Sequence, residues 1–335
     1  MEAGVSRTPD ERLRGLPDFP FESSYEEVDG LRLAYLDEGE GPPVVFFHGE
    51  PTWSFLWRKV IPPVAAAGFR CIAPDYAGFG RSDKPTDVGF YTYDRHIELM
   101  TELLGRLELS GATAVVHDWG GPIGLRLAVE HPEWFERLVV METGPFTGHQ
   151  RMSDAWLAFR DFVRNAEEVP VGMLIRGGCK HDPGDEVIAA YEAPYIDAAA
   201  KAGARAFPLI LPTEPDAPGA AAGKAVADAL REDERPTLVI WAEDDPVLPF
   251  SVGERVASQL NFPPPVPIAD ALREDDRPTL VLWAEDDPVL PFAVGERVSE
   301  QLNFPPPIPI PDASHFLQED AGPEIGAIIA KWLRA

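Results

Sequence analysis

Short apolar segments alternate with amphipathic segments along the first half of the chain. Continuous apolar runs such as residues 43–47 and 114–116 are typical of buried parallel strands, whereas residues 93–109 place leucines on one face of a helix. Strands that alternate with helices predict an α/β protein with a mainly parallel sheet. We expect strands at residues 25–28, 31–36, 43–47, 70–73, 114–116 and 137–141, the first two joined as a hairpin.

The strand pattern stops after Gly144. Residues 146–224 contain helical segments, for example residues 155–165 and 185–191, but no further strand rhythm. This change predicts a helical cap over residues 146–224. The cap is inserted between two parts of one core, which we expect to span residues 1–145 and 225–335.

A tandem repeat follows the cap. Residues 227–268 recur as residues 269–310 with few changes, among them Ile240 to Leu282. Each copy predicts a strand, an acidic loop, a helix and a short strand after three prolines. Two copies are too few for a solenoid, so the repeat indicates a duplicated β-α-β unit. Because only the second copy continues into His315, we expect the second copy in the sheet and the first as an insertion.

The sharpest local signal is Asp118. An apolar strand at residues 114–116 leads into it, and three glycines within residues 120–124 open the next helix. Glycines let a helix approach a strand closely, and this layout is that of a nucleophile elbow. The exposed side chain here would be a carboxylate. The competing interpretation is that Asp118 only caps the helix.

A carboxylate nucleophile needs donors for an oxyanion, a base, and an acid that orients the base. The backbone N–H of Glu50, in the loop after the third strand, is expected as one oxyanion donor, and the N–H of Trp119 as the other. His315 is the expected base and Asp287 the expected acid. The chain order is then nucleophile, acid, base.

The duplication leaves a second candidate acid. Asp245 in the first copy is equivalent to Asp287 in the second. Asp287 is separated from His315 by enough chain for one crossover helix and one strand. If both copies entered the sheet in series, His315 would be displaced by roughly 10 Å and could not serve Asp118.

Four motifs carry a resemblance over nearly the whole chain apart from one repeat copy. They are residues 48–54 (His-Gly-Glu-Pro-Thr-Trp-Ser), residues 74–85, residues 118–120 (Asp-Trp-Gly) and residues 313–316 (Ala-Ser-His-Phe). Together they resemble the haloalkane dehalogenases of the α/β-hydrolase superfamily, in the subgroup whose acid follows the seventh strand. The resemblance implies an α/β-hydrolase fold with a mostly parallel eight-stranded sheet and an inserted helical cap.

The resemblance also implies a reaction. Asp118 would displace the halide from a haloalkane and form an alkyl ester, which water activated by His315 would hydrolyse to an alcohol. Trp119 and Trp156 would hold the departing halide, because an indole N–H is a donor only. The resemblance implies Phe207 and Pro208 as pocket residues, with no cofactor and with a small halogenated molecule and water as the reactants.

Composition narrows the possible partners. The net charge is −27, from 29 Lys and Arg against 56 Asp and Glu, which disfavours nucleic acids and anionic membranes. The two cysteines and the absence of metal-ligand spacings indicate neither disulfides nor a metal site. No apolar run approaches a membrane span. We expect an acidic, soluble, cytoplasmic monomer.

Two other functions remain open. An epoxide hydrolase shares the aspartate nucleophile but would protonate the epoxide oxygen with cap tyrosines, for which Tyr191 and Tyr195 are available. A non-catalytic relative, inactivated by the duplication, is the other alternative.

Overall fold

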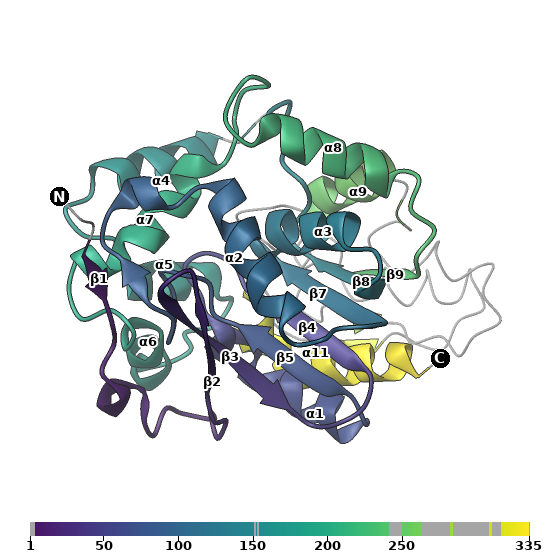
Figure 1. Cartoon of the computed structure of the whole chain (residues 1–335), viewed down its shortest axis with the longest axis horizontal. Helices are drawn as coiled ribbons and strands as arrows, with labels where there is room; N and C mark the ends of the chain where they lie inside the picture. Colours follow the sequence, from purple (N-terminus) through teal and green to yellow (C-terminus); the bar gives the residue numbers. More distant parts are fainter. Residues whose placement is uncertain are drawn as a thin grey trace.

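The computed structural model describes residues 4–150, 152, 154–240, 250–260, 262, 282–283, 308–309 and 316–334. Seven described strands form the main sheet, in the order β2-β3-β5-β4-β7-β8-β9 (Figure 1). Strands β2 and β3 form the expected hairpin and β3 also runs antiparallel to β5, while the remaining pairs are parallel. The strands span Ser24–Val28 (β2), Leu31–Glu38 (β3), Pro43–Phe47 (β4), Arg70–Pro74 (β5), Ala112–His117 (β7), Phe135–Met141 (β8) and Thr237–Ile240 (β9).

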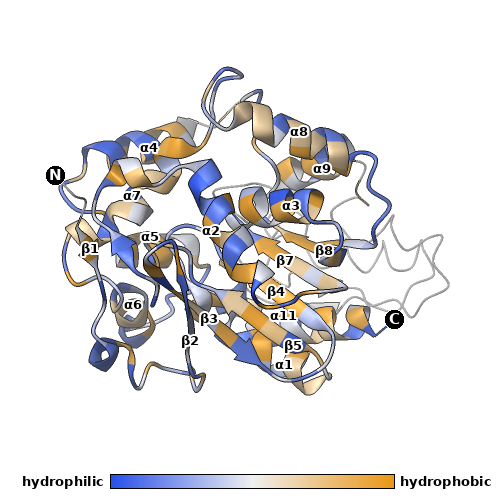
Figure 2. Cartoon of the chain, in the orientation of Figure 1, coloured by the Kyte–Doolittle hydropathy of each residue, from blue (hydrophilic) through white to orange (hydrophobic). Residues whose placement is uncertain are grey.

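The mostly parallel α/β sheet predicted from the alternating pattern is confirmed, with seven strands of the expected eight among the described residues. Every residue of β7 is buried, as is β4 after Pro43, because helices cover both faces of the sheet. Figure 2 shows these central strands as mainly apolar, whereas helix α2 alternates polar and apolar residues.

Helices pack on both faces of the sheet (Figure 1). One face carries α2 (Tyr93–Gly105), α3 (Gly120–Glu130), α8 (Ala220–Leu230) and α9 (Phe250–Leu260). The other face carries α1 (Ile61–Ala66) and the C-terminal helix α11 (Leu317–Leu333). The 3-10 helix η2 (Ser54–Lys59) directly precedes α1 in the chain. Shorter elements are β1 (Val5–Ser6), paired with β6 (Lys84–Pro85), and the 3-10 helices η1 (Asp10–Leu13) and η3 (Val88–Phe90).

Four α-helices gather at one end of the sheet, between β8 and α8 in the sequence (Figure 1). They lie within the range predicted for the cap, and α8 then packs against α3 of the core. The cap elements are α4 (Asp154–Asn165), α5 (Val171–Gly178), α6 (Asp185–Glu192), the 3-10 helix η4 (Ala199–Lys201) and α7 (Ala202–Ile210).

Among the described residues, the first repeat copy and not the second supplies a strand to the main sheet. Strand β9 pairs in parallel with β8, and the N–H of Leu138 donates to Pro236 O at 3.0 Å. In α9 of the same copy, Ala257 and Leu260 are buried in the core. The second copy contributes β10 (Leu282–Trp283), which pairs with β11 (Ile308–Pro309) in a separate two-stranded sheet.

The expectation that the second copy occupies the sheet is therefore wrong for the described strands. The position beside β8 can hold one strand only, and the first copy reaches it through a short turn after α8. The sequences agree with this placement, because the buried Ala257 corresponds to the polar Ser299 in the second copy.

A matched pair of substitutions tests which copy packs in the core. Val239→Asp puts a charge at a position of β9 that is 1% exposed, and should lower the free energy of unfolding by about 3 kcal/mol or more. Val281→Asp, the equivalent change in the second copy, should cost less. Denaturant unfolding measures both, and an equal or larger loss for Val281→Asp would contradict the placement of β9.

Candidate active site

Asp118 lies in the two-residue turn between β7 and α3. Its backbone has φ of 48°, in the left-handed region that non-glycine residues seldom adopt. The turn is held by the N–H of Gly121, which donates to Asp118 O at 2.9 Å. A Cβ at position 120 would lie 2.1 Å from Phe47 O, so only glycine lets α3 start this close to β4.

The loop after β4 lies directly against the Asp118 carboxylate. The backbone N–H of Glu50 donates to Asp118 Oδ1 at 2.6 Å. A Cβ at Gly49 would lie 2.2 Å from the same oxygen, so glycine is needed here to admit the carboxylate. Two sequence-predicted site residues, Asp118 and Glu50, are thus in direct contact.

Buried polar residues hold this loop in place. Burial lowers the pKa of His48 to about 4, so its ring is neutral at pH 7. Its Nε2 accepts a hydrogen bond from the Tyr76 N–H at 3.2 Å, and its Nδ1 lies 3.0 Å from Gly49 O, which assigns the proton to Nδ1. His48 therefore has the structural role that a buried, doubly hydrogen-bonded imidazole can fill.

Asp75 supports the far end of the loop. Its carboxylate accepts the Ser54 N–H at 2.8 Å and the Arg81 Nε at 2.9 Å, and all three residues are buried. The guanidinium beside it holds the pKa of Asp75 below its usual value against the opposing effect of burial. The loop from the end of β4 to η2 is thus fixed at both ends.

The side chain of Glu50 has an unusual environment. It is buried, and neither of its carboxyl oxygens has a hydrogen-bond partner among the described residues. Burial and, second, the nearby Asp118 charge raise the pKa of Glu50 well above its ordinary value. The environment therefore favours the protonated form of Glu50 beside the Asp118 carboxylate.

Trp119 connects the elbow to the cap. Its indole is buried and stacks on the ring of Phe207 from α7, with centroids 4.6 Å apart and planes 9° apart. Pro208 follows in the same helix and is also buried. The expected pocket residue Phe207 therefore contacts one of the two expected halide-binding residues.

Trp156 lies on α4 of the cap. The guanidinium of Arg160, one turn later, is 5.8 Å from the centre of its ring. Arg160 donates to Thr213 Oγ1 and to Leu209 O, so α4 is tied to the end of α7. These contacts fix the helix that carries Trp156 on the helix that carries Phe207.

His315, Asp287 and Asp245 lie outside the described residues. The residue after His315 is described, however, and Phe316 is buried with its ring centre 6.1 Å from that of His117. His117 immediately precedes Asp118. The chain neighbours of the expected nucleophile and the expected base are therefore in contact.

Glu142 is a carboxylate near the elbow that was not predicted from the sequence. Glu142 is fully buried, follows β8 directly and, like Asp118, has a positive φ, 42°. His117 and Met141 are paired in parallel, so Asp118 and Glu142 are the next residues on neighbouring strands, which lie about 4.8 Å apart. The available signal was an acidic residue at the end of an apolar strand.

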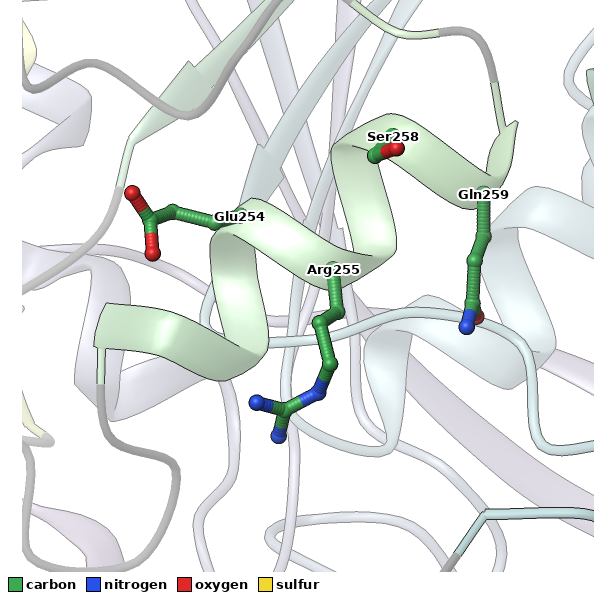
Figure 3. Close-up of a pocket in the computed structure, with 4 residues that line it drawn as sticks. All are labelled: Glu254, Arg255, Ser258 and Gln259. Atoms are coloured by element: carbon green, nitrogen blue, oxygen red, sulfur yellow. The ribbon is translucent and has the colours of Figure 1, made fainter.

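A hollow on the surface of α9 contains none of these groups. It is lined by Glu254, Arg255, Ser258 and Gln259, whose side chains diverge from one exposed helix in Figure 3. No described helix is long and apolar enough to cross a membrane.

The fold and the elbow define the class of protein. A family model described as "alpha/beta hydrolase fold" matches residues 42–175. A haloalkane dehalogenase of Mycolicibacterium paratuberculosis is 38% identical over 338 aligned residues, which cover 99% of this chain and 99% of the relative. One from Mycobacterium marinum is 46% identical over 251 residues, covering 73% of this chain and 84% of that protein.

A solved structure agrees with the sequence relatives. The tetrameric haloalkane dehalogenase DpaA from Paraglaciecola agarilytica NO2 superposes with a TM-score of 0.78 at 27% identity, covering 96% of each chain. The chain belongs to the haloalkane dehalogenases.

The buried Glu50 carboxyl makes a prediction about stability and pH. The pKa of Glu50 is higher in the folded than in the unfolded protein, where it is about 4.3. The contribution of Glu50 to the free energy of unfolding is therefore fully present below the unfolded pKa, and it is lost as the pH rises through the folded pKa. Glu50→Gln removes this loss. Its melting temperature relative to the unsubstituted protein should therefore be higher at pH 8 than at pH 4.5.

The exposed Glu136 provides the control for that measurement. Thermal unfolding of Glu136→Gln should show no comparable gain with pH. A Glu50→Gln difference that is constant from pH 4.5 to pH 8 would show that Glu50 ionises normally in the folded protein.

Proposed function

We propose that this chain hydrolyses haloalkanes to an alcohol and a halide through a covalent ester on Asp118. An oxygen of the Asp118 carboxylate attacks the carbon that bears the halogen. The new C–O bond forms as the C–halogen bond breaks, and the halide leaves with the bonding electrons. Water gives one proton to His315 while its oxygen adds to the ester carbonyl. Collapse of this tetrahedral intermediate breaks the bond to the alkyl oxygen, which leaves as the alcohol with the proton of the added hydroxyl. This restores the Asp118 carboxylate, and His315 passes its proton to solvent.

The contact between Glu50 and Asp118 is the observation that carries this proposal. The Glu50 N–H holds Asp118 Oδ1 at 2.6 Å. Alkylation of the other oxygen would leave Oδ1 as the ester carbonyl oxygen, already bound to the donor that stabilises it as an oxyanion. The N–H of Trp119, at the start of α3, is the second donor we propose.

Two indoles are proposed to receive the halide. Trp119 is buried and its face is covered by Phe207, which gives the apolar, desolvated surroundings in which an indole N–H binds an anion well. Trp156 is proposed as the second donor, and Phe207 with Pro208 as part of the pocket wall. The substrate class that fits an apolar wall of this kind is a small halogenated hydrocarbon.

The base and its acid complete the proposed site. The contact of Phe316 with His117 supports His315 as the base. Asp287 was expected as the acid because the second copy was expected in the sheet. Since β9 belongs to the first copy, its equivalent Asp245 is favoured by the position of the strand, and Glu142 is the third carboxylate available.

The epoxide hydrolase alternative loses one of its two tyrosines. The hydroxyl of Tyr191 donates to Glu319 Oε1 at 2.5 Å in a buried site and is committed there. The relatives identified by sequence are haloalkane dehalogenases.

We also propose that the chain acts as a monomer in the cytoplasm, although DpaA is a tetramer.

Removing the base should trap the covalent intermediate. With 1,2-dibromoethane, His315→Ala should release one bromide per enzyme and then stop, with turnover reduced roughly 10³-fold or more. Intact-mass and peptide mass spectrometry should find the alkyl group on Asp118. Asp118→Asn is the control and should form no adduct.

Two results would contradict the proposal. Conversion of styrene oxide to its diol without bromide release from dibromoethane would indicate an epoxide hydrolase. The absence of an adduct with any reactive haloalkane would indicate a non-catalytic relative.

A series of amide variants identifies the acid. We expect Asp245→Asn to slow ester hydrolysis by roughly 10²- to 10⁴-fold, because an amide no longer stabilises the imidazolium. Asp287→Asn, the same change in the other copy, should stay within about twofold, and steady-state halide release measures both. Slow hydrolysis in Asp287→Asn, with nearly normal hydrolysis in Asp245→Asn, would assign the role of the acid to Asp287. Full activity in both variants, together with loss of activity in Glu142→Gln, would assign it to Glu142.

A further inference from the structure

Four polar groups from two other elements meet the Glu319 carboxylate near the start of α11. Arg58 binds it in a bidentate manner, with Nη2 at 2.7 Å from Oε2 and Nη1 paired with Oε1. Lys59 Nζ lies 3.2 Å from Oε2 and donates to Glu319 O at 2.7 Å, and the Tyr191 hydroxyl donates to Oε1. The side chains of Arg58 and Glu319 are 0% and 1% exposed.

Aromatic packing closes this cluster from the remaining side. The Arg58 guanidinium lies 3.9 Å from the centre of the Phe55 ring, and Tyr191 meets the same ring edge to face at 5.1 Å. Arg58 and Phe55 belong to η2, Tyr191 to cap helix α6 and Glu319 to α11. One carboxylate therefore joins the loop beyond Glu50, the cap and the C-terminal helix.

A buried ion pair of this kind is a poor source of stability. The cost of removing both charges from water often equals or exceeds their attraction, and an apolar pair of similar volume would pack as well. The bidentate guanidinium of Arg58 and the hydroxyl of Tyr191 fix the geometry of Glu319, because each hydrogen bond restricts the orientation of its carboxylate. The arrangement suits positioning better than stabilisation.

The positioned segment begins immediately after His315. The Phe316 N–H donates to Gly178 O of cap helix α5 at 3.0 Å, and a Cβ at Gly178 would lie 2.3 Å from the Phe316 ring. The Glu319 N–H donates to Phe316 O at 2.7 Å, and Asp320 accepts the N–H of Lys180 at 3.1 Å. Residues 316–320 are thus docked on the cap by several contacts within one helical turn.

We propose that Glu319 is a positioning residue that holds the chain after His315 against the cap and η2, and so sets the imidazole for hydrolysis of the ester. This inference rests on the proposed function. The two chemical steps differ in what they need: formation of the alkyl ester uses Asp118 and the halide site, whereas its hydrolysis also needs the base. A displacement of the base by about 1 Å can slow a step by about 10²-fold. Loss of Glu319 therefore slows the second step selectively.

The test separates the two steps in the full-length protein. Glu319→Gln keeps the size of the side chain but removes its charge. On rapid mixing with 1,2-dibromoethane, the first bromide should be released at a rate within about threefold of the unsubstituted protein, while ester hydrolysis should slow by about 10-fold or more. The alkyl–Asp118 adduct should then accumulate during turnover and be visible by intact mass.

Glu324→Gln is the matched control, because Glu324 is an exposed residue of the same helix. It should leave both rates unchanged. Equal slowing of both steps in Glu319→Gln, without adduct accumulation, would show that Glu319 only supports the fold, and unchanged rates would show that it has no role. Either result overturns the inference.

A milder variant covers the case in which Glu319→Gln does not fold. Tyr191→Phe removes one hydrogen bond to Glu319 and leaves the ion pair, and it should slow hydrolysis by about two- to fivefold with a smaller accumulation of adduct. No selective slowing in Tyr191→Phe would then overturn the inference. Failure of the proposed function is distinguishable, because the unsubstituted protein would then release no bromide.

Discussion

The left-handed backbone at Asp118 is the constraint on which the site depends. It turns the chain between β7 and α3 within two residues, so that the carboxylate lies at the end of its strand and meets the N–H of Glu50. Such a conformation persists only where its surroundings determine it. Here the close approach of Gly120 to β4 and the hydrogen bond from Gly121 do so.

The surroundings of this turn are built in layers. The loop that carries Glu50 is held by His48 and Asp75, both of which are buried and hydrogen-bonded to backbone N–H groups. The cap adds Phe207, which covers the indole of Trp119. The half-buried Asp118 carboxylate thus lies among buried groups, and burial together with the Asp118 charge favours the protonated form of Glu50.

Local patterns were enough to predict the mostly parallel sheet, the helices that follow β8 and the sharp turn at Asp118. The runs at residues 44–47 and 114–116 are apolar throughout, as expected for strands covered on both faces, and the glycines after Asp118 predict a close strand-helix contact. Glu50 was predicted beside Asp118 because, in the layout of a nucleophile elbow, the loop after the third strand supplies an N–H for the oxyanion.

Tertiary choices were beyond the reach of the sequence. Nothing local pairs Arg58 with Glu319, which are far apart in the chain, and Glu142 carries no motif besides its position after a strand. The two repeat copies have the same periodicity, so their pattern could not decide which one enters the sheet. The distinguishing substitution, Ala257 against Ser299, gains meaning only once Ala257 is seen to be buried.

The placement of β9 beside β8 also affects how the chain reaches its native state. The two repeat copies have nearly the same sequence, so the strand segment of either copy can pair with β8 while the chain folds. A few side chains and the loop length decide which copy pairs with β8. The first copy closes the smaller loop from the cap, so the entropic cost of its pairing is lower. Duplication has therefore left this chain with a second copy of its own strand sequence, which loop length disfavours at β8.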